Sequence, residues 1–329
     1  MGAIDIHAHA VLEAAFGAAG SYGPELAPDP DGVPFFRIGD YTMKPMSYRG
    51  SLFMDVDRRL RAMDRDGIEM QLLSPNPLTL FHGIPADDAI RFCRIHNDAM
   101  AELVGQHPGR LLGAAALPMQ DVDAATTELV RCTRELGLTA PYTGTDFGYE
   151  LDDARLDDFY RTLIELDVAL FLHPASSDGR GLPPPKMRRF DLSLLLGYAY
   201  DETLAVSALV LGGVTERHPD VDICISHGGG VIALLAEKFA FAAETRPWVS
   251  EHLRDGGFLR HLRRLWFDTH MDAAPALDLL VATVGTERLV FGTNYGGWDS
   301  GGRHARDEFT LSLSHNARRL LRLPEKETT

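Results

Sequence analysis

Two histidines near the start of the chain have the spacing of a metal site. His7 and His9 lie two positions apart in the apolar, β-prone run Ile4-Asp5-Ile6-His7-Ala8-His9. Because side chains alternate between the two faces of a strand, both imidazoles point the same way. Two neutral imidazoles on one strand suit a borderline-soft divalent ion such as zinc. Two solvated histidines near the N-terminus are the alternative, so the pair needs support from the rest of the chain.

Two further histidines end apolar runs that are typical of strands. His173 ends the run from 168 to 173, and His227 ends the run from 221 to 227. Either one alone is compatible with a core histidine. Together with the first pair they put four imidazoles at the ends of three predicted strands, which we interpret as one metal-centred site. The glycines at 228–230 would let backbone or substrate approach closely, although a tight turn explains them too.

The last predicted strand ends on an unusual residue for such a site. A metal centre of this kind would be completed by an ionised carboxylate, but the strand from Leu289 ends at Asn294. An amide oxygen is a weak ligand, carries no charge and cannot act as a base. Three imidazoles and an amide leave the charge of a divalent ion uncompensated among its direct ligands, so we expect the ion to be held less firmly.

These residues require a scaffold that brings strand ends together. Eight short apolar strands alternate with helical patterns, the clearest of which cover 54–66, 86–106, 121–136, 152–166 and 201–217. No long polar linker divides the chain. The pattern therefore favours an α/β fold, a single (β/α)₈ TIM barrel over residues 1–329, rather than a two-domain doubly wound fold. In such barrels the catalytic groups lie at the carboxyl ends of the strands.

Two segments interrupt the alternation. Residues 11–52 are rich in glycine, proline and aromatic residues, and the stretch 34–43 predicts a short β-hairpin. We expect this insertion to lie over the mouth of the barrel. A loop at 176–190 carries four basic residues, which suggests an anionic ligand but also fits a solvated loop: Arg180, Lys186, Arg188 and Arg189.

Charge and cysteine content limit the partners and the compartment. The net charge of −15 argues against a nucleic acid or an anionic membrane as partner. Cys93, Cys132 and Cys224 lack disulfide or metal-site spacing, so we expect them to be reduced and buried. No uninterrupted apolar stretch approaches the roughly 18 residues of a membrane span. With no signal-peptide pattern either, the sequence predicts a cytoplasmic protein.

Several motifs in combination resemble the amidohydrolase-related decarboxylases. They are Asp5-Ile6-His7-Ala8-His9, Leu172-His173-Pro174, Ser226-His227-Gly228-Gly229-Gly230, Phe267-Asp268-Thr269 and Phe291-Gly292-Thr293-Asn294-Tyr295. The similarity covers nearly the whole chain and is greatest to the group of aminocarboxymuconate-semialdehyde and γ-resorcylate decarboxylases. It implies a TIM barrel, usually a homodimer, with one catalytic zinc ion, or manganese in its place. It also implies non-oxidative loss of CO₂ from a small unsaturated or aromatic carboxylic acid.

The resemblance also implies roles for individual residues. The metal ligands would be His7, His9 and His173, with Asn294 in the fourth position, and His227 would be the catalytic acid or base. Arg49 would hold the substrate carboxylate, and Arg246 would be a second arginine, supplied by the neighbouring subunit. A guanidinium fork suits a carboxylate. For each arginine an ordinary surface position is the alternative.

The resemblance breaks at residue 294. The relatives have aspartate there, followed by Tyr-Pro, where this chain has Tyr295-Gly296. An engineered substitution, a natural variant with altered chemistry and a member without catalysis are all compatible with Asn294. Because the following residues also differ, we favour a natural variant. A metal-dependent hydrolase or hydratase of the same superfamily, or a non-catalytic binding protein, are the alternatives to a decarboxylase.

Overall fold

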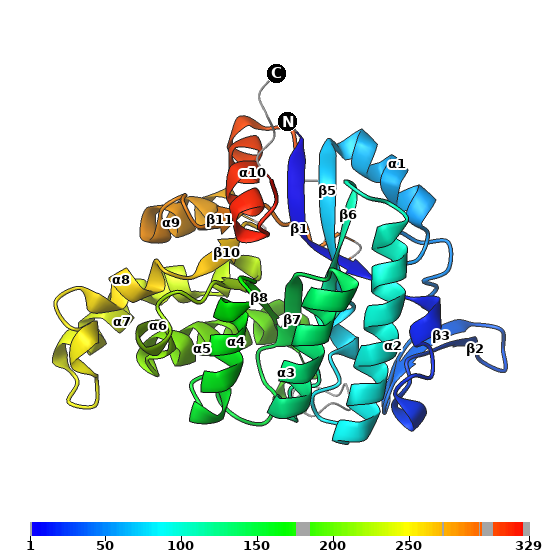
Figure 1. The fold of residues 1–329 in the computed structure, drawn as a ribbon, viewed down its shortest axis with the longest axis horizontal. Coiled ribbons are helices and arrows are strands. Elements are labelled where there is room, and N and C mark those ends of the chain that lie inside the picture. Colours follow the sequence, from blue (N-terminus) through cyan, green and yellow to red (C-terminus); the bar gives the residue numbers. More distant parts are fainter. Residues whose placement is uncertain (1, 176–184, 272, 296, 298–304, 325–329) are drawn as a thin grey trace.

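Eight parallel strands form the centre of the molecule. The computed structural model describes residues 2–175, 185–271, 273–295, 297 and 305–324. The sheet order is β1 (Ala3–Ala10), β5 (Ile68–Pro75), β6 (Leu111–Ala116), β7 (Ala140–Gly144), β8 (Leu170–His173), β9 (Ile223–Ile225), β10 (Trp266–Asp268) and β11 (Leu289–Val290). The segment after β11 returns to β1, where His9 N donates to Tyr295 O and Tyr295 N donates to His7 O. The strands therefore form a nearly closed barrel, and the predicted (β/α)₈ fold is confirmed (Figure 1).

Helices follow the strands and surround the barrel. They are α1 (Val56–Asp66), α2 (Ala86–Gly105), α3 (Val122–Arg131), α4 (Asp157–Glu165), α5 (Tyr198–Leu211), α6 (Val214–Arg217), α7 (Ile232–Thr245), α8 (Gly257–Leu262), α9 (Ala274–Val284) and α10 (Glu308–Leu320). Three of them begin at an aspartate cap whose carboxylate accepts from the backbone N–H three residues later, namely Asp55, Asp121 and Asp307. Gly67 ends α1 in the left-handed region, at φ 83°.

The predicted helix at 201–217 is wrong in its extent. A π-helical turn (Ser193–Gly197) runs directly into α5, so the helical segment begins eight residues earlier. It then ends at Gly212 and Gly213, and the latter has φ 78°. The short α6 follows as a separate helix. The apolar pattern continues across the two glycines, and the break is set by the backbone at Gly213.

The N-terminal insertion contains the predicted hairpin and one further strand. β3 (Pro34–Ile38) pairs with β4 (Tyr41–Met43), and β2 (Glu25–Pro28) adds a third antiparallel strand. Prolines at both ends of β2 concealed it in the sequence. Phe36 and Ile38 belong to the same buried cluster as Phe81 and Phe92. In Figure 1 this sheet lies beside α2; that the insertion covers the barrel mouth stays a prediction.

One helical segment has a largely apolar surface. The span Ser193–Leu211 is long and apolar enough, by length and composition, to cross a membrane, with 39% of the tested window buried. Its inner face packs in the core of the barrel through Ala205, Val206 and Leu209, as expected for a barrel helix. Large apolar side chains remain exposed on this segment and around the next helix, α7; those at least 49% exposed are Leu195, Leu196, Tyr200, Leu204, Leu234, Phe241 and Trp248.

The three cysteines have the state predicted for them. Cys93, Cys132 and Cys224 are all buried and none forms a disulfide. Burial raises the pKa of each thiol, so all three remain protonated at neutral pH. They act as small apolar side chains of the core.

Candidate metal centre

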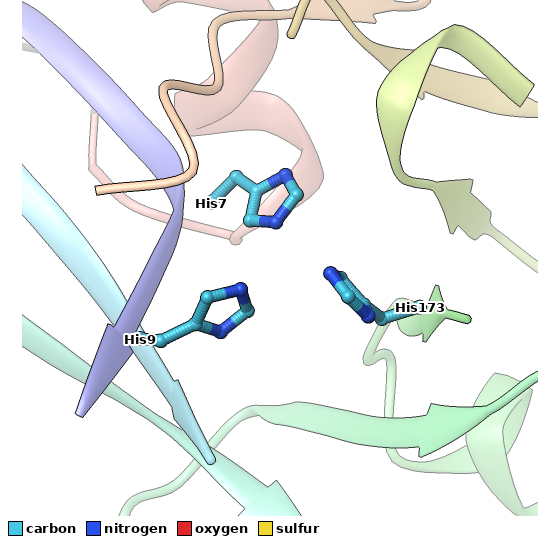
Figure 2. Close-up of side chains that lie close together, drawn as sticks. All are labelled: His7, His9 and His173. Carbon is cyan, nitrogen blue, oxygen red and sulfur yellow. The ribbon is translucent and has the colours of Figure 1, made fainter. Parts of the chain in front are cut away.

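Three of the predicted ligands meet inside the barrel. His7 and His9 come from β1 and His173 comes from the end of β8, and Figure 2 shows the three rings turned toward one another from two sides. One ring nitrogen of each lies within 4.8 Å of the others. The exposed fraction is 2% for His7, 2% for His9 and 1% for His173. The prediction that these three histidines lie close together is therefore confirmed.

Hydrogen bonds fix which nitrogen of each ring is available. His7 Nδ1 lies 2.7 Å from Asp268 Oδ2, and His173 Nδ1 lies 2.8 Å from the Pro174 carbonyl oxygen. An ionised carboxylate and a carbonyl can only accept, so both Nδ1 atoms must donate. The Nε2 atom of each ring then carries a lone pair. Among the described residues, neither of these two Nε2 atoms has a hydrogen-bond partner.

His9 is fixed in the same way through a hydroxyl group. Its Nδ1 lies 2.8 Å from Ser74 Oγ, and Ser74 Oγ donates its own hydrogen to the Ala8 carbonyl oxygen at 3.2 Å. The serine therefore accepts from Nδ1, and His9 also presents Nε2 as a lone-pair donor. Three neutral rings, each held through Nδ1 by an acceptor behind it, form the donor set that a divalent metal requires.

Burial keeps these rings neutral. Desolvation lowers the pKa of His9 to about 3, and it holds the pKa of His7 and His173 well below the usual histidine range. The neighbouring imidazoles lower all three further, because positive charges so close together repel. At neutral pH the ligands therefore need not lose a proton to bind a metal.

His227 lies beside the three ligands but differs from them in exposure. Its ring centroid is 4.8 Å from that of His7 and 5.0 Å from that of His173. Its side chain is 16% exposed, so it reaches the open side of the site. Its Nδ1 lies 2.7 Å from Oε1 of Glu202, a completely buried carboxylate on α5. This pairing directs the His227 Nε2 away from Glu202 and stabilises positive charge on the ring.

Asn294 also lies at the centre. It is 6% exposed, and its side chain is hydrogen-bonded to His9. Its φ of 50° lies in the left-handed region, which asparagine tolerates better than most residues. The structure thus brings Asn294 to the metal ligands, and its service as a fourth ligand stays a prediction.

A glycine permits the close approach of β1, β10 and the segment after β11. A Cβ atom on Gly292 would lie 2.9 Å from the Cβ of His7 and 3.1 Å from the Cγ of Asp268. Both distances are too short for a side chain to be accommodated without movement. Gly292 therefore allows the His7–Asp268 hydrogen bond to form.

The two arginines predicted to bind substrate lie at the surface. Arg49 is 56% exposed and forms an ion pair with Glu13 at 2.5 Å. Arg246 is exposed at the C-terminal end of α7. Their roles toward substrate stay predictions. Of the basic loop residues, Arg180 lies outside the described part of the chain, and Arg189 stacks on Phe190 at the surface.

The side chains that orient the histidines were not predicted from the sequence. Asp268 ends a predicted strand, and its position there was a usable signal. Glu202 lies within a helix and Ser74 within an apolar strand, so neither had one. His270 was also missed; its ring centroid is 5.4 Å from that of His227.

A buried polar network connects the strands that carry the ligands. Asp5 accepts from Thr293 Oγ1 at 2.7 Å and from Gln71 Nε2 at 2.9 Å. Gln71 in turn accepts from Arg59 Nη1 at 3.0 Å, and Arg59 Nη2 donates to the carbonyl oxygen of His9 at 2.5 Å. Burial raises the pKa of Asp5 to about 6 and lowers that of Arg59 to about 10, so both are predominantly charged at neutral pH. The network holds β1, β5 and the segment after β11 in register.

Comparison with known proteins gives the family. The amidohydrolase family model matches residues 4–323, and the chain belongs to this family. The 2-amino-3-carboxymuconate-6-semialdehyde decarboxylase of Dictyostelium discoideum is 29% identical over 242 residues, which cover 73% of this chain and 66% of that protein. The γ-resorcylate decarboxylase of Rhizobium radiobacter is 36% identical over 222 residues, covering 63% of each chain. The matched parts thus span just under two thirds of these relatives.

Solved structures share the fold. A dihydroxybenzoic acid decarboxylase from a Polaromonas species, solved with bound manganese and the inhibitor 2-nitroresorcinol, superimposes with a TM-score of 0.75 at 24% identity. The superposition covers 99% of this chain and 98% of that one. This likeness establishes the fold of the barrel over its full length.

Proposed function

We propose that this protein is a metal-dependent, non-oxidative decarboxylase of a small aromatic or unsaturated carboxylic acid. The observation that carries the proposal is the convergence of three buried, neutral imidazoles beside the His227–Glu202 pair. The named decarboxylases among its relatives support the same reaction class.

The donor set suits a divalent transition metal. His7, His9 and His173 would hold the ion, with the amide oxygen of Asn294 as the candidate fourth ligand. When bound, the ion would supply positive charge that stabilises negative charge developing on a substrate oxygen. Imidazole ligands suit both zinc and manganese. We propose zinc, with manganese as the alternative that the Polaromonas structure suggests.

His227 is positioned to deliver the proton that decarboxylation requires. When the bond to the carboxyl carbon breaks, its electron pair stays on the substrate carbon and CO₂ leaves. That carbon then takes up one proton, so the net reaction consumes a carboxylate and a proton. His227 can donate from Nε2, because Nδ1 is engaged by Glu202. The carboxylate of Glu202 offsets the positive charge of the protonated ring.

Two arginines are proposed to bind the anionic substrate. Arg49 would exchange its contact with Glu13 for a substrate carboxylate, since exposed ion pairs are weak.

Arg246 would act from a neighbouring subunit. Its helix carries Phe241, with Trp248 just beyond, and these side chains are 70% and 62% exposed, which fits a surface covered by a second copy of the chain. We accordingly propose a homodimer. We also propose a cytoplasmic location, which the three free cysteines support.

The proposal is tested by product analysis. The metal-loaded protein is incubated with γ-resorcylate and related hydroxybenzoates, and dissolved CO₂ and the residual aromatic product are quantified. We expect equimolar CO₂ and decarboxylated product, and at least about 100-fold slower formation of both with the His227→Asn variant. Incorporation of solvent oxygen into the acid without CO₂ release would instead indicate a hydratase or hydrolase.

A further inference from the structure

The direct ligands of the candidate metal site carry no formal charge. Three imidazoles and the Asn294 amide are neutral, so they leave both positive charges of a divalent ion uncompensated. An ion of that charge in a buried site is unfavourable unless negative charge lies nearby.

The side chains directly behind the ligands carry that negative charge. Asp5, Asp268 and Glu202 are each 0% exposed, and Arg59 is 2% exposed. When the three carboxylates are ionised and His227 is neutral, these side chains carry two net negative charges, equal and opposite to a divalent ion. Among the described residues the only other buried charged side chains are Glu128 and Arg318, which are paired elsewhere with Arg131 and Glu69.

Asp268 is the carboxylate best connected to a ligand. Its Oδ2 accepts from Nδ1 of His7 at 2.7 Å, and its Oδ1 accepts from the backbone N–H of His270 at 2.9 Å. The Asp268 carboxylate would therefore be separated from a bound ion by only the imidazole ring of His7. Glu202 is connected through His227, which is a neighbour of the ligands rather than one of them.

We infer that Asp268, together with Glu202, supplies the charge that holds the metal ion in this chain, and that the amide of Asn294 contributes little to metal affinity. Asp268 is thus a positioning residue, which fixes the ring of His7 and compensates the ion without touching it. The inference rests on the proposed function only in requiring that a divalent metal binds. It accounts for a metal site whose candidate fourth ligand, Asn294, carries no charge.

The test compares metal affinities of purified, folded variants, measured by competition with a chromophoric chelator for zinc and manganese. Asp268→Asn keeps an acceptor of the same shape for His7 but removes the charge, and we expect the dissociation constant to rise about 10- to 100-fold. Asn294→Ala should change it less than about 3-fold. Glu128→Gln removes another buried carboxylate, one that is paired with Arg131 and contacts none of the three histidines, and should leave it unchanged.

Two results would overturn the inference. One is a larger loss of affinity in Asn294→Ala than in Asp268→Asn, and the other is an unchanged affinity in Asp268→Asn. If Asp268→Asn does not fold, Glu202→Gln tests the same charge through the second carboxylate, and an unchanged affinity there overturns the inference equally. The failure of the proposed function is distinguishable, because in that case the unmodified protein itself would bind no stoichiometric metal.

Discussion

Each of the three candidate ligand histidines is fixed by a different acceptor: a carboxylate for His7, a hydroxyl group for His9 and a backbone carbonyl for His173. Only the first two acceptors can be removed by substitution. Since the acceptor sets both the tautomer and the direction of the ring, it controls how well Nε2 binds a metal.

Removing the hydroxyl group behind His9 should weaken metal binding. In Ser74→Ala, Nδ1 of His9 loses its acceptor, and the ring can exchange tautomers or turn. We expect the metal dissociation constant to rise about 10-fold, measured by chelator competition. Ser312→Ala, on the exposed face of α10, is the matched control. Equal affinities for the two variants would contradict the role assigned to Ser74.

The division between ligand and acid or base is tested by a pair of variants. His173→Ala removes one of three donors, so metal content after dialysis should fall. His227→Asn should retain the metal and lower turnover about 10²- to 10⁴-fold, because it removes only the proton donor. Metal analysis and initial rates on the same samples give both quantities. Parallel loss of metal in both variants would make His227 a ligand.

The sequence was informative about the histidines and much less so about their partners. His7, His9, His173 and His227 could be predicted because they end strands, and strand ends meet at one face of a barrel. Glu202 and His227 are 25 residues apart in sequence, and they contact each other because of the face that α5 turns toward the site. No local sequence pattern determines which face of α5 points toward the site. The roles proposed for Arg49 and Arg246 involve contacts with substrate and with a second subunit, and no local sequence pattern contains that information.

At the level of elements, α1 shows how a helix can stabilise the site from outside the barrel. Its charged residues look like a solvated face, yet Arg59 is 2% exposed and donates to both Gln71 and the His9 carbonyl. The helix thus anchors the backbone of β1 directly at a ligand residue.

Substitution of Arg59 should destabilise the whole fold. Arg59→Leu leaves Gln71 Oε1 and the His9 carbonyl without their buried donor and removes the positive charge near Asp5. We expect a loss of about 3 kcal/mol in the free energy of unfolding. Urea unfolding followed by circular dichroism measures it. Arg61→Leu, at an exposed position of the same helix, should cost less than about 0.5 kcal/mol. Similar losses for both would contradict the network.

A buried histidine on α2 makes stability depend on pH. Burial lowers the pKa of His96 from 6.5 to about 4, far from the metal centre. The unfolded chain therefore binds a proton at this residue below pH 6.5 while the folded chain does not, so stability is lost as pH falls from 6.5 toward 4. This residue accounts for about 3 kcal/mol of that loss. His96→Leu should remove it, seen as a shallower pH dependence in urea unfolding between pH 7 and pH 4. Parallel curves would contradict the assignment.

The boundaries of elements were predicted well where a cap or a glycine marks them and poorly elsewhere. Asp55 and Gly67 mark both ends of α1, and the predicted 54–66 is close to the observed 56–66. By contrast, the strand β2 was not predicted, because prolines lie at both of its ends. Pairing with the neighbouring strand decided this case, and a local pattern does not contain that information.

For the whole molecule, the alternation of eight apolar strands with helices predicted the barrel, because no long polar linker divides the chain into the two domains of a doubly wound alternative. Closure came from the segment after β11, which bonds to β1 and brings Asn294 to the histidines. Exposed apolar side chains gather on α5 and α7, including Leu204, Leu234 and Phe241.

Subunit mixing tests whether Arg246 acts in the neighbouring site. Arg246→Ala and His227→Asn should each be inactive as homodimers. In a mixed dimer, one site would combine the intact His227 of one subunit with the intact Arg246 of the other. Random mixing by co-expression should therefore restore roughly a quarter of the normal activity, from the two-fold symmetry of a dimer. Activity no higher than the sum of the two homodimers would place Arg246 outside the partner's site.

A metal titration shows whether the three histidines bind one catalytic metal ion. Metal-free protein is titrated with zinc or manganese while CO₂ release from γ-resorcylate and bound metal are measured together. We expect that activity rises in proportion to bound metal and reaches its maximum at one ion per chain. We expect no activity in His173→Ala at the same metal concentration. Full CO₂ release by the metal-free protein, or undiminished metal-dependent activity in His173→Ala, would contradict these expectations.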